Sequence, residues 1–318
     1  MILKLQANLS AERRRSLLAG ARRLAPGARF AACRGGLKVS GLAPAAAADA
    51  APLFANLSGV LGTAFTDAEL CPLACAPGRR PLSRPLDFRK GPVFVAGPCA
   101  VEDEASYLSS ARALKASGAN ALRAALFKPR SSPYAFQGLG WAGLKIILKA
   151  KKETGLPLVT EATDTRQVAR LAAACDVLQV GARSMRNYEL LKEIGRSRRA
   201  ALLKRASGAT LREWLLSAEY LLKYGVKELI LCERGCREGS LDLRLLREAK
   251  KLTGLPVLAD PSHAAGTRER AEELARKALS GGADGLLIEA AANPYAARVD
   301  GRQTVTLETF RRIAERRK

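Results

Sequence analysis

The stretch LPLVTEATDTRQVARLAAACDVLQVGAR, residues 156–183, decides the fold of this chain. Two short apolar runs, at 156–160 and 177–180, enclose a segment with the pattern of an amphipathic helix. Continuous apolar runs of this kind indicate strands that are buried on both faces, as in a parallel sheet. The stretch therefore predicts two parallel strands joined by a helix.

The same alternation extends over the chain from residue 92 onward. The predicted strands are 93–96, 121–127, 156–160, 177–180, 201–203, 228–231, 256–259 and 285–288. Eight strand–helix units that close on themselves make a TIM barrel, which typically takes about 250 residues. An open doubly wound sheet is the alternative, but no G-x-G-x-x-G follows the first strand, which argues against its dinucleotide-binding form. We predict an α/β fold with a (β/α)8 TIM barrel at 92–318.

The segment before the barrel has a different pattern and is predicted to be a small α+β domain at 1–76. A short apolar run at 2–5 predicts a strand, and Ser10 suits the N-cap of a helix. The apolar face of that helix is predicted to hold Leu17, Leu18, Ala21 and Leu24. A stretch rich in proline and arginine at 77–91 is predicted as the linker. Two domains agree with the length of 318 residues, at about 150 residues per domain.

The composition excludes several classes of protein. With 48% hydrophobic and 26% charged residues, the chain is in the globular range and not in that of a collagen, a coiled-coil array or a disordered protein. It has no run of roughly 18 apolar residues and no signal-peptide pattern, so we expect a soluble protein of the cytoplasm. In that compartment the seven cysteines are expected to be mostly reduced thiols.

The net charge of +23 would suit nucleic acid, an acidic membrane surface or anionic metabolites as partners. The chain has no tract of five or more consecutive Lys or Arg residues, and aromatic residues make up 5% of it. It therefore lacks both a basic tail and a base-stacking surface, and we expect neither nucleic acid nor a membrane as partner. Anionic small molecules are the expected partners.

Polar residues follow the predicted strands, and in a TIM barrel this end of the strands carries the chemistry. Cys99, His263 and Glu289 follow the first, seventh and eighth strands, which are neighbours in a closed barrel. Together with Asp300 in the DGRQ segment they offer one sulfur, one imidazole and two carboxylates, a set that suits a divalent transition metal. A buried apolar role for Cys99 is the alternative.

A second group of strand-end residues is basic. It consists of Arg123, Lys128, Arg130, Arg183, Lys204, Arg205 and Arg234. Any one of them could belong to a solvated face, but seven cations on one rim would repel one another unless anions compensate them. We therefore expect a substrate with phosphate or carboxylate groups.

At these residues the chain resembles the 3-deoxy-D-arabino-heptulosonate-7-phosphate (DAHP) synthases, of the type I family that is related to the 3-deoxy-manno-octulosonate-8-phosphate synthases. The resemblance extends from residue 94 to the C-terminus. FKPRSSPYAFQGLG at 127–140 is its most specific segment and resembles the DAHP synthase form of this loop. The segments GPCAVE, VGAR, LLKR, LLSAEY, LCERG, DPSH and DGRQ occur in the family's order.

The resemblance implies a transferase that condenses phosphoenolpyruvate with D-erythrose 4-phosphate to DAHP and phosphate, the first step of the shikimate pathway to the aromatic amino acids. It implies one divalent metal ion, Mn, Fe, Co or Zn, bound by Cys99, His263, Glu289 and Asp300. The residues implied to hold phosphoenolpyruvate are Arg123, Lys128, Arg183, Lys204 and Arg234, with the backbone of Ala182. Those implied to hold the erythrose phosphate are Arg130 and Ser131.

Three residues are expected to act in catalysis, namely Lys128, Cys99 and His263. Lys128 is predicted to deliver a proton to the developing alkoxide, with a metal-bound water as the alternative. Water must add to C2 before phosphate leaves, and Glu161 is a candidate for the base that activates it.

The chain departs from the family's pattern at several alanines. They are Ala124, Ala125, Ala206, Ala264, Ala265, Ala290, Ala291 and Ala292. Several of these alanines stand where the family has glycine, and each adds a methyl group near backbone that approaches substrate. One alternative is therefore a paralogue with weakened catalysis that only binds a metabolite or a partner protein. An octulosonate-phosphate synthase is another, and the KPRSSP segment argues against it.

The resemblance also implies that the segment before the barrel is a ferredoxin-like regulatory domain with an aromatic amino acid, tyrosine or phenylalanine, as effector. A domain that only stabilises the oligomer is the alternative. The resemblance implies a homotetramer or homodimer.

Overall fold

The structure is a computed structural model that describes residues 1–76, 78, 82, 84–236 and 239–315. The chain divides into two compact units, Met1–Cys75 and Ala76–Lys318. Within the predicted linker at 77–91, residues 77, 79–81 and 83 lie outside the described part. None of the helices in the described ranges is long and apolar enough to cross a membrane.

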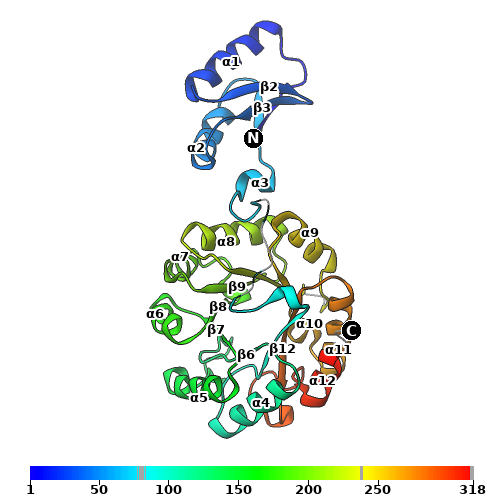
Figure 1. Cartoon of the computed structure of the whole chain (residues 1–318). Helices are drawn as coiled ribbons and strands as arrows, with labels where there is room; N and C mark the ends of the chain where they lie inside the picture. The colour runs from blue at the N-terminus through cyan, green and yellow to red at the C-terminus, as the bar shows by residue number, and fades with distance from the viewer. Residues whose placement is uncertain (77, 79–81, 83, 237–238, 316–318) are drawn as a thin grey trace. The chain divides into compact units, whose positions relative to one another are not determined.

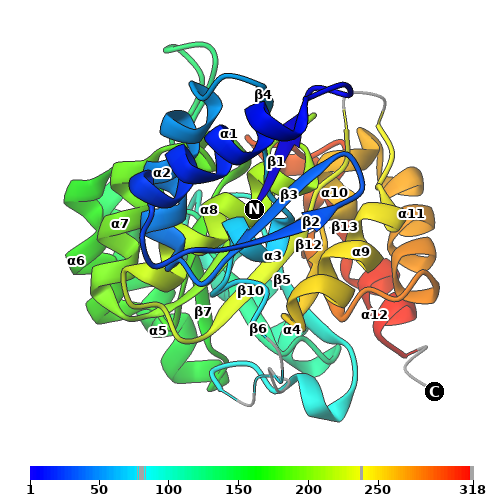
Figure 2. The same cartoon turned by 90° about the horizontal axis from the view of Figure 1, so that it is seen from above.

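The N-terminal unit is built on an antiparallel sheet with strand order β2-β3-β1-β4. Its elements are β1 (Ile2–Leu5), α1 (Ala11–Leu24), β2 (Arg29–Cys33), β3 (Gly36–Ser40), α2 (Pro44–Ala55), β4 (Val60–Ala64) and α3 (Asp67–Leu70), which Figure 2 draws in blue to cyan. The succession β-α-β-β-α-β with this strand order is the ferredoxin-like arrangement. The small α+β fold predicted for this segment is confirmed.

One apolar core holds the N-terminal unit together. Leu17 and Ala21 of α1 and Phe54 of α2 pack in the same cluster as Leu3 of β1 and Leu37 of β3. Leu3 and Leu37 are direct partners in the sheet, so their side chains point to the same face. Both helices therefore cover one face of the sheet.

The first helix begins and ends close to the predicted positions. The Ser10 hydroxyl accepts a hydrogen bond from the Arg13 N–H at 3.3 Å, as expected of an N-cap. Leu24, which was predicted on the buried face, is 39% exposed instead. It is the last residue of the helix, beyond the packed stripe that Leu17, Gly20 and Ala21 form.

The second unit contains a closed barrel of eight parallel strands within the described residues (Figure 1). The strands are β5 (Val93–Gly97), β6 (Ala121–Arg123), β7 (Leu158–Ala162), β8 (Val177–Val180), β9 (Ala200–Lys204), β10 (Leu229–Glu233), β11 (Val257–Ala259) and β12 (Gly285–Ala291). Each pairs with the next in chain order, and β12 pairs with both β11 and β5, which closes the ring. The predicted TIM barrel is confirmed.

Helices surround the barrel and connect its strands (Figure 1). They are α4 (Glu104–Ala116), α5 (Leu144–Thr154), α6 (Thr165–Ala174), α7 (Tyr188–Ser197), α8 (Leu211–Lys223), α9 (Leu243–Thr253), α10 (Pro261–Ala265), α11 (Arg268–Ser280) and α12 (Leu307–Glu315). Side chains cap several of their N-termini, for example Asp103 at α4 and Thr210 at α8. A two-residue strand, β13 (Val305–Thr306), extends the sheet beside β12.

The amino ends of the strands are closed by the chain that leads into the barrel. Leu86 is buried in the same cluster as Val93, Val177 and Ala200, which stand at the start of their strands. Leu82 and Phe88 pack against that cluster, and a 3-10 turn at Phe88–Lys90 follows. Because the amino ends are covered, the carboxyl ends are left for the functional site.

The second barrel strand is shorter than predicted. The apolar run suggested a strand over 121–127, but β6 ends at Arg123. After this point the Ala125 carbonyl accepts from the Val101 N–H, and the Leu126 carbonyl accepts from Gly140. Ala124, Ala125 and Leu126 are therefore buried in a loop and not in the sheet.

Candidate metal centre and anion-binding cavity

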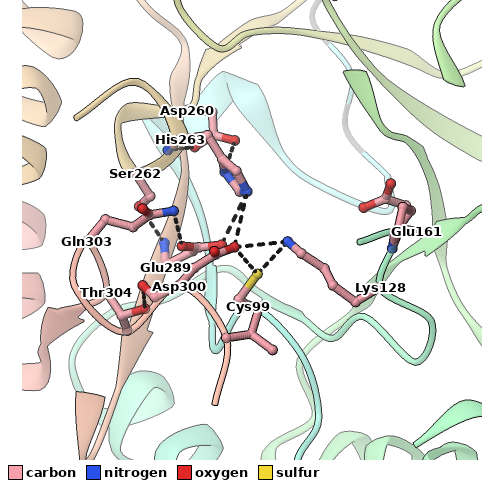
Figure 3. Close-up of polar contacts among 12 residues, drawn as sticks. Cys99, Lys128, Glu161, Asp260, Ser262, His263, Glu289, Asp300, Gln303 and Thr304 are labelled. Carbon is pink, nitrogen blue, oxygen red and sulfur yellow. Dashed lines mark hydrogen bonds and ion pairs between the residues drawn. The ribbon is translucent and has the colours of Figure 1, made fainter. Parts of the chain in front are cut away.

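Four side chains with metal-ligating atoms meet at the carboxyl end of the barrel (Figure 3). Cys99 follows β5, His263 lies in the short helix after β11, Glu289 lies within β12, and Asp300 lies in the loop between β12 and β13. One candidate ligand atom from each residue lies within 4.8 Å of those of the others. The neighbouring strands β11, β12 and β5 bring the first three together, as the closed barrel requires.

The distances within this cluster are short, and their pattern fits a cation at the centre. Cys99 Sγ lies 3.0 Å from Asp300 Oδ2, and His263 Nε2 lies 3.4 Å from Glu289 Oε1 and 4.0 Å from Asp300 Oδ2. Glu289 Oε1 is buried and has no hydrogen-bond partner among the described residues. Arg123 Nη1 and His263 Nε2 lie 3.3 and 3.4 Å from this oxygen without a hydrogen bond to it, so the carboxylate keeps a lone pair for a cation at the centre. The cluster of sulfur, nitrogen and two oxygens could therefore hold a divalent transition metal ion.

His263 is oriented by a buried carboxylate. Its Nδ1 lies 2.8 Å from Asp260 Oδ2, and its backbone N–H donates to Asp260 Oδ1 at 3.1 Å. Burial alone would raise the pKa of Asp260, but His263 and Lys204 outweigh it and hold that pKa well below its usual range. A carboxylate on one imidazole nitrogen fixes the ring, so that Nε2 faces the cluster.

Glu289 is held by two further polar contacts. The Gln303 amide donates to Glu289 Oε2 at 3.1 Å, and the Glu289 backbone N–H donates to the Ser262 hydroxyl at 2.9 Å. Asp260, Ser262 and Gln303 had no predicted role, although they stand in the quoted segments DPSH and DGRQ. The available signal was their position, since each stands within three residues of a predicted ligand.

Lys128 reaches the cluster from the loop after β6. Its Nζ lies 2.6 Å from Cys99 Sγ and 3.1 Å from Asp300 Oδ2 (Figure 3). Burial lowers the pKa of Lys128, but the negative charges of the cluster outweigh it and raise that pKa. For the acidic Asp300, burial acts in the raising direction, but the charge of Lys128 is the main cause that lowers the pKa of Asp300 to about 2. Lys128 is thus a protonated amine in contact with the candidate ligands.

The Cys99 thiol holds its proton more firmly than a free cysteine does. Burial and the charge of Glu289 raise its pKa well above the ordinary value, although Arg123 and Lys128 act in the opposite direction. A bound metal ion would reverse this balance, because a coordinating thiol is deprotonated. Binding of a metal to this cluster should therefore release a proton.

A cavity of about 430 Å³ opens beside the cluster. Its lining contains Lys128, Pro129, Arg130, Ser131, Ser132, Ala135, Glu161, Gly181, Ala182, Arg183, Lys204, Arg234, His263 and Asp300. Every residue predicted to hold substrate is among them except Arg123. Five Lys or Arg side chains from the described residues face this one volume, so the cavity suits a ligand with several negative charges.

Two of these cationic side chains donate hydrogen bonds to backbone carbonyl groups. Arg183 Nη1 donates to the Pro129 carbonyl at 3.0 Å, and Arg234 Nη2 donates to the His263 carbonyl at 3.2 Å. Arg130 Nη1 is buried without a hydrogen-bond partner among the described residues. A buried guanidinium nitrogen that lacks a partner is the feature expected where an anion binds.

Two predicted members of the basic group lie elsewhere. Arg123 is 4% exposed, and its Nη1 lies 3.3 Å from Glu289 Oε1. Arg205 is also buried, and its guanidinium forms a bidentate ion pair with Glu233, with Nη2 at 2.8 Å from Oε1. The prediction that Arg205 lies on the cavity rim is wrong, because the carboxylate of the neighbouring strand occupies its donors.

Glu161 lines the cavity and lies apart from the cluster of Cys99, His263, Glu289 and Asp300 in Figure 3. Gln179 donates to Glu161 Oε2 at 3.0 Å. Gly181 leaves room for this carboxylate, since a Cβ atom at residue 181 would lie 1.9 Å from Glu161 Oε1. An alanine at this position would therefore require the Glu161 carboxylate to move.

The alanine positions that depart from the family's pattern do not narrow the cavity. Ala124, Ala125, Ala206 and Ala264 are buried, and none of them is among the described residues that line it. Ala291 lies at a separate, smaller cavity of about 140 Å³ behind Cys99. The methyl groups of these five alanines are accommodated in buried positions.

Comparison with known proteins shows which family this chain resembles. A model of the DAHP synthetase I family matches residues 89–318. The phospho-2-dehydro-3-deoxyheptonate aldolase of Thermotoga maritima is 38% identical over 231 residues, which cover 71% of this chain and 68% of that protein. The 2-dehydro-3-deoxyphosphooctonate aldolase of Geobacter sulfurreducens is 31% identical over 240 residues, covering 68% of this chain and 87% of that protein.

Solved structures give the same result for the fold. The crystal structure of the Thermotoga maritima DAHP synthase matches with a TM-score of 0.82 at 29% identity, over 99% of this chain and 95% of that one. A truncated form of the synthase from the same organism matches with a TM-score of 0.64 at 34% identity, over 70% of this chain and 84% of that one. The first of these matches includes the N-terminal unit as well as the barrel.

Proposed function

This chain belongs to the DAHP synthetase I family, and from that premise we propose that it is a DAHP synthase of the shikimate pathway. It condenses phosphoenolpyruvate with D-erythrose 4-phosphate to DAHP and releases inorganic phosphate. One observation carries the proposal: a Cys-His-Glu-Asp cluster adjoins a cavity that five cationic side chains line. Two phosphates and a carboxylate must come together in this reaction, and such a cavity supplies the compensating charge.

The cationic side chains divide between the two substrates. Phosphoenolpyruvate is held by Lys128, Arg183, Lys204 and Arg234, with the backbone of Ala182. Arg123 contributes from the barrel interior, where its charge also offsets that of Glu289. Erythrose 4-phosphate is held through its phosphate by Arg130 and Ser131, and the unpartnered Nη1 of Arg130 supports this assignment.

Cys99, His263, Glu289 and Asp300 hold one divalent transition metal ion, Mn, Fe, Co or Zn. When bound, the ion supplies Lewis-acid polarisation of the aldehyde oxygen. Glu289 Oε1, which accepts no hydrogen bond among the described residues, and the orientation of His263 by Asp260 support this role for the cluster.

Lys128 moves the proton that the condensation requires. Carbon–carbon bond formation turns the aldehyde oxygen of erythrose 4-phosphate into an alkoxide, which needs a proton. Lys128 Nζ is protonated, buried and placed between the metal cluster and the cavity, so it can deliver that proton. Glu161, across the cavity, is the candidate base for the water that adds to C2 of phosphoenolpyruvate.

The N-terminal unit acts as a regulatory domain that binds an aromatic amino acid, tyrosine or phenylalanine. Its ferredoxin-like topology and its inclusion in the match to the full-length Thermotoga structure support this. Removal of residues 1–76 should abolish inhibition by the effector and leave turnover intact. Unchanged sensitivity would instead favour a domain that only stabilises the homotetramer or homodimer. We also assign the enzyme to the cytoplasm.

Substrate discrimination tests the proposed reaction. Phosphate release is measured from phosphoenolpyruvate with either erythrose 4-phosphate or arabinose 5-phosphate, in the presence of Mn. We expect release with the four-carbon sugar and little with the five-carbon sugar. The reverse preference would make the chain an octulosonate-phosphate synthase. Binding of phosphoenolpyruvate without phosphate release in the presence of either sugar would make it a weakened paralogue.

A further inference from the structure

Asp300 is the member of the metal cluster that the barrel holds least directly. Glu289 lies inside β12 and is fully buried, whereas Asp300 lies in a loop and its side chain is 27% exposed. The φ angle of Asp300 is +56°, a left-handed conformation that is uncommon outside glycine, although aspartate adopts it more often than most residues. Contacts from the rest of the chain hold this turn on both sides.

Glu102 provides such contacts on the side where the chain enters the turn. Its two carboxylate oxygens both accept from the Arg298 N–H at 2.9 Å, and Oε1 also accepts from the Val299 N–H at 3.1 Å. Glu102 stands three residues after Cys99, and these N–H groups come one and two residues before Asp300. The Glu102 carboxylate thus links the loop that carries Cys99 to the loop that carries Asp300.

Arg268 provides contacts on the side where the chain leaves the turn. Its Nε donates to the Thr304 carbonyl at 2.7 Å, and its Nη2 donates to the Gly301 carbonyl at 3.0 Å. The Tyr295 ring covers the guanidinium at 4.3 Å. A rigid fork that spans two carbonyls restrains the turn more than a single flexible donor would.

Apolar packing supports the same junction. Val299 is buried in a small cluster with Cys99 and Ala100, and Phe136 packs against it. The Arg298 guanidinium lies 3.9 Å from the centre of the Phe136 ring. The turn is therefore seated on the Cys99 loop and held from both ends.

We propose that Glu102 and Arg268 are positioning residues that clamp the Asp300 turn and keep its carboxylate at the metal cluster. The inference rests on the proposed function in taking the cluster as the metal site. Without Glu102, two backbone N–H groups lose their acceptor and the left-handed turn can relax. Asp300 then moves away from Cys99 and His263, so the affinity for metal falls while the phosphoenolpyruvate contacts persist.

The test is a cobalt titration of the chelated full-length protein, followed through the absorption of cobalt bound to thiolate. The Glu102→Ala variant is compared with Glu104→Ala. Glu104 stands two residues after Glu102, and its carboxylate forms an exposed ion pair with Lys149. We expect Glu102→Ala to weaken cobalt binding about tenfold or more, as changes around metal ligands commonly do. Glu104→Ala should bind cobalt like the wild type, and Glu102→Gln, which keeps an acceptor oxygen, should recover most of the affinity.

A second readout separates positioning from general destabilisation. Saturating metal should restore most of the turnover of Glu102→Ala, because only the occupancy of the site has changed. Cobalt affinity equal to that of the wild type, or an equal loss in Glu104→Ala, would overturn the clamp. If Glu102→Ala does not fold, Arg268→Lys takes its place, and unchanged cobalt affinity in that variant would overturn the clamp as well.

The outcome also distinguishes the clamp from the proposed reaction. A wild-type protein that binds cobalt through thiolate without catalytic turnover would contradict the reaction and leave the cobalt test of the clamp intact. A wild-type protein that turns over, together with a Glu102→Ala variant of undiminished affinity, would contradict the clamp alone.

Discussion

The imidazole Nδ1 of His263 lies 2.8 Å from Asp260 Oδ2, and this contact directs Nε2 of the chain's single histidine towards Glu289 and Asp300. Lys204, which lines the cavity, forms an ion pair with the same Asp260 oxygen. The metal cluster and the anion-binding cavity are therefore joined through one buried carboxylate. Changes at Asp260 should affect both.

Replacement of Asp260 by asparagine should weaken metal binding. The variant keeps the size of the side chain but loses the charge that orients His263 and balances Lys204. Loss of such a partner typically lowers metal affinity by about 10- to 100-fold. Titration of the chelated protein with Mn measures the effect, with Asp164→Asn at the exposed N-terminus of α6 as control. Equal affinities in the two variants would contradict the role given to Asp260.

Replacement of Arg130 by alanine should affect one substrate selectively. A hydrogen bond to a charged group contributes about 1.5–3 kcal/mol, so the KM for erythrose 4-phosphate should rise by about tenfold or more. The KM for phosphoenolpyruvate should stay nearly constant. Initial-rate kinetics measure both, with Arg112→Ala, an exposed residue paired with Glu153, as control. A rise confined to phosphoenolpyruvate would reverse the assignment of the two subsites.

Gly181→Ala should damage the cavity wall. The added methyl group would lie 1.9 Å from Glu161 Oε1, so the carboxylate or the strand must move. The carboxylate ends a flexible side chain, so moving it costs little stability beyond its hydrogen bond with Gln179, and we expect a lower kcat with a nearly unchanged melting temperature. Gly27→Ala is the control, because nothing lies within 4 Å of its Cβ position. Wild-type turnover in Gly181→Ala would show that the position of the Glu161 carboxylate does not matter for the reaction.

Acid stability should depend in part on Glu213 in the barrel unit. The Thr210 N–H and the Arg186 guanidinium lower its pKa from 4.5 to about 2. A depressed pKa stabilises the fold above the unfolded value and loses this contribution as pH falls from about 4.5 towards 2. Urea midpoints at pH 7 and pH 3 should therefore differ less in Glu213→Gln than in the wild type. An identical acid-induced loss in the two proteins would exclude this contribution.

The barrel could be predicted because its strands are nearly uninterrupted apolar runs. Val177–Val180 was predicted to the residue, since it is buried along its whole length. The run at 121–127 misled because Ala124, Ala125 and Leu126 are equally apolar but are buried by loop packing. A run of apolar residues indicates that the segment is buried, but it does not distinguish a buried loop from a strand.

The candidate site could be predicted as a set of residue types at strand ends, but its pairings could not. Arg205 and Arg234 looked alike in the sequence, yet Arg205 is neutralised by Glu233 on the neighbouring strand. The contacts of Glu102 with the Asp300 turn join residues that are 196 and 197 positions apart. Such contacts follow from the closure of the barrel and the course of its loops, which no local pattern records.

The most direct test of the central claim is phosphate release from phosphoenolpyruvate and erythrose 4-phosphate by chelated protein resupplied with Mn, with Cys99→Ala measured in parallel. We predict release that depends on Mn in the wild type and is lost in the variant, because Cys99 Sγ is one of four candidate ligand atoms that lie within 4.8 Å of one another. Release that is indifferent to chelation, or that persists in Cys99→Ala, would contradict the metal-dependent mechanism. Absence of release from a wild-type protein that binds both Mn and phosphoenolpyruvate would contradict the assigned reaction.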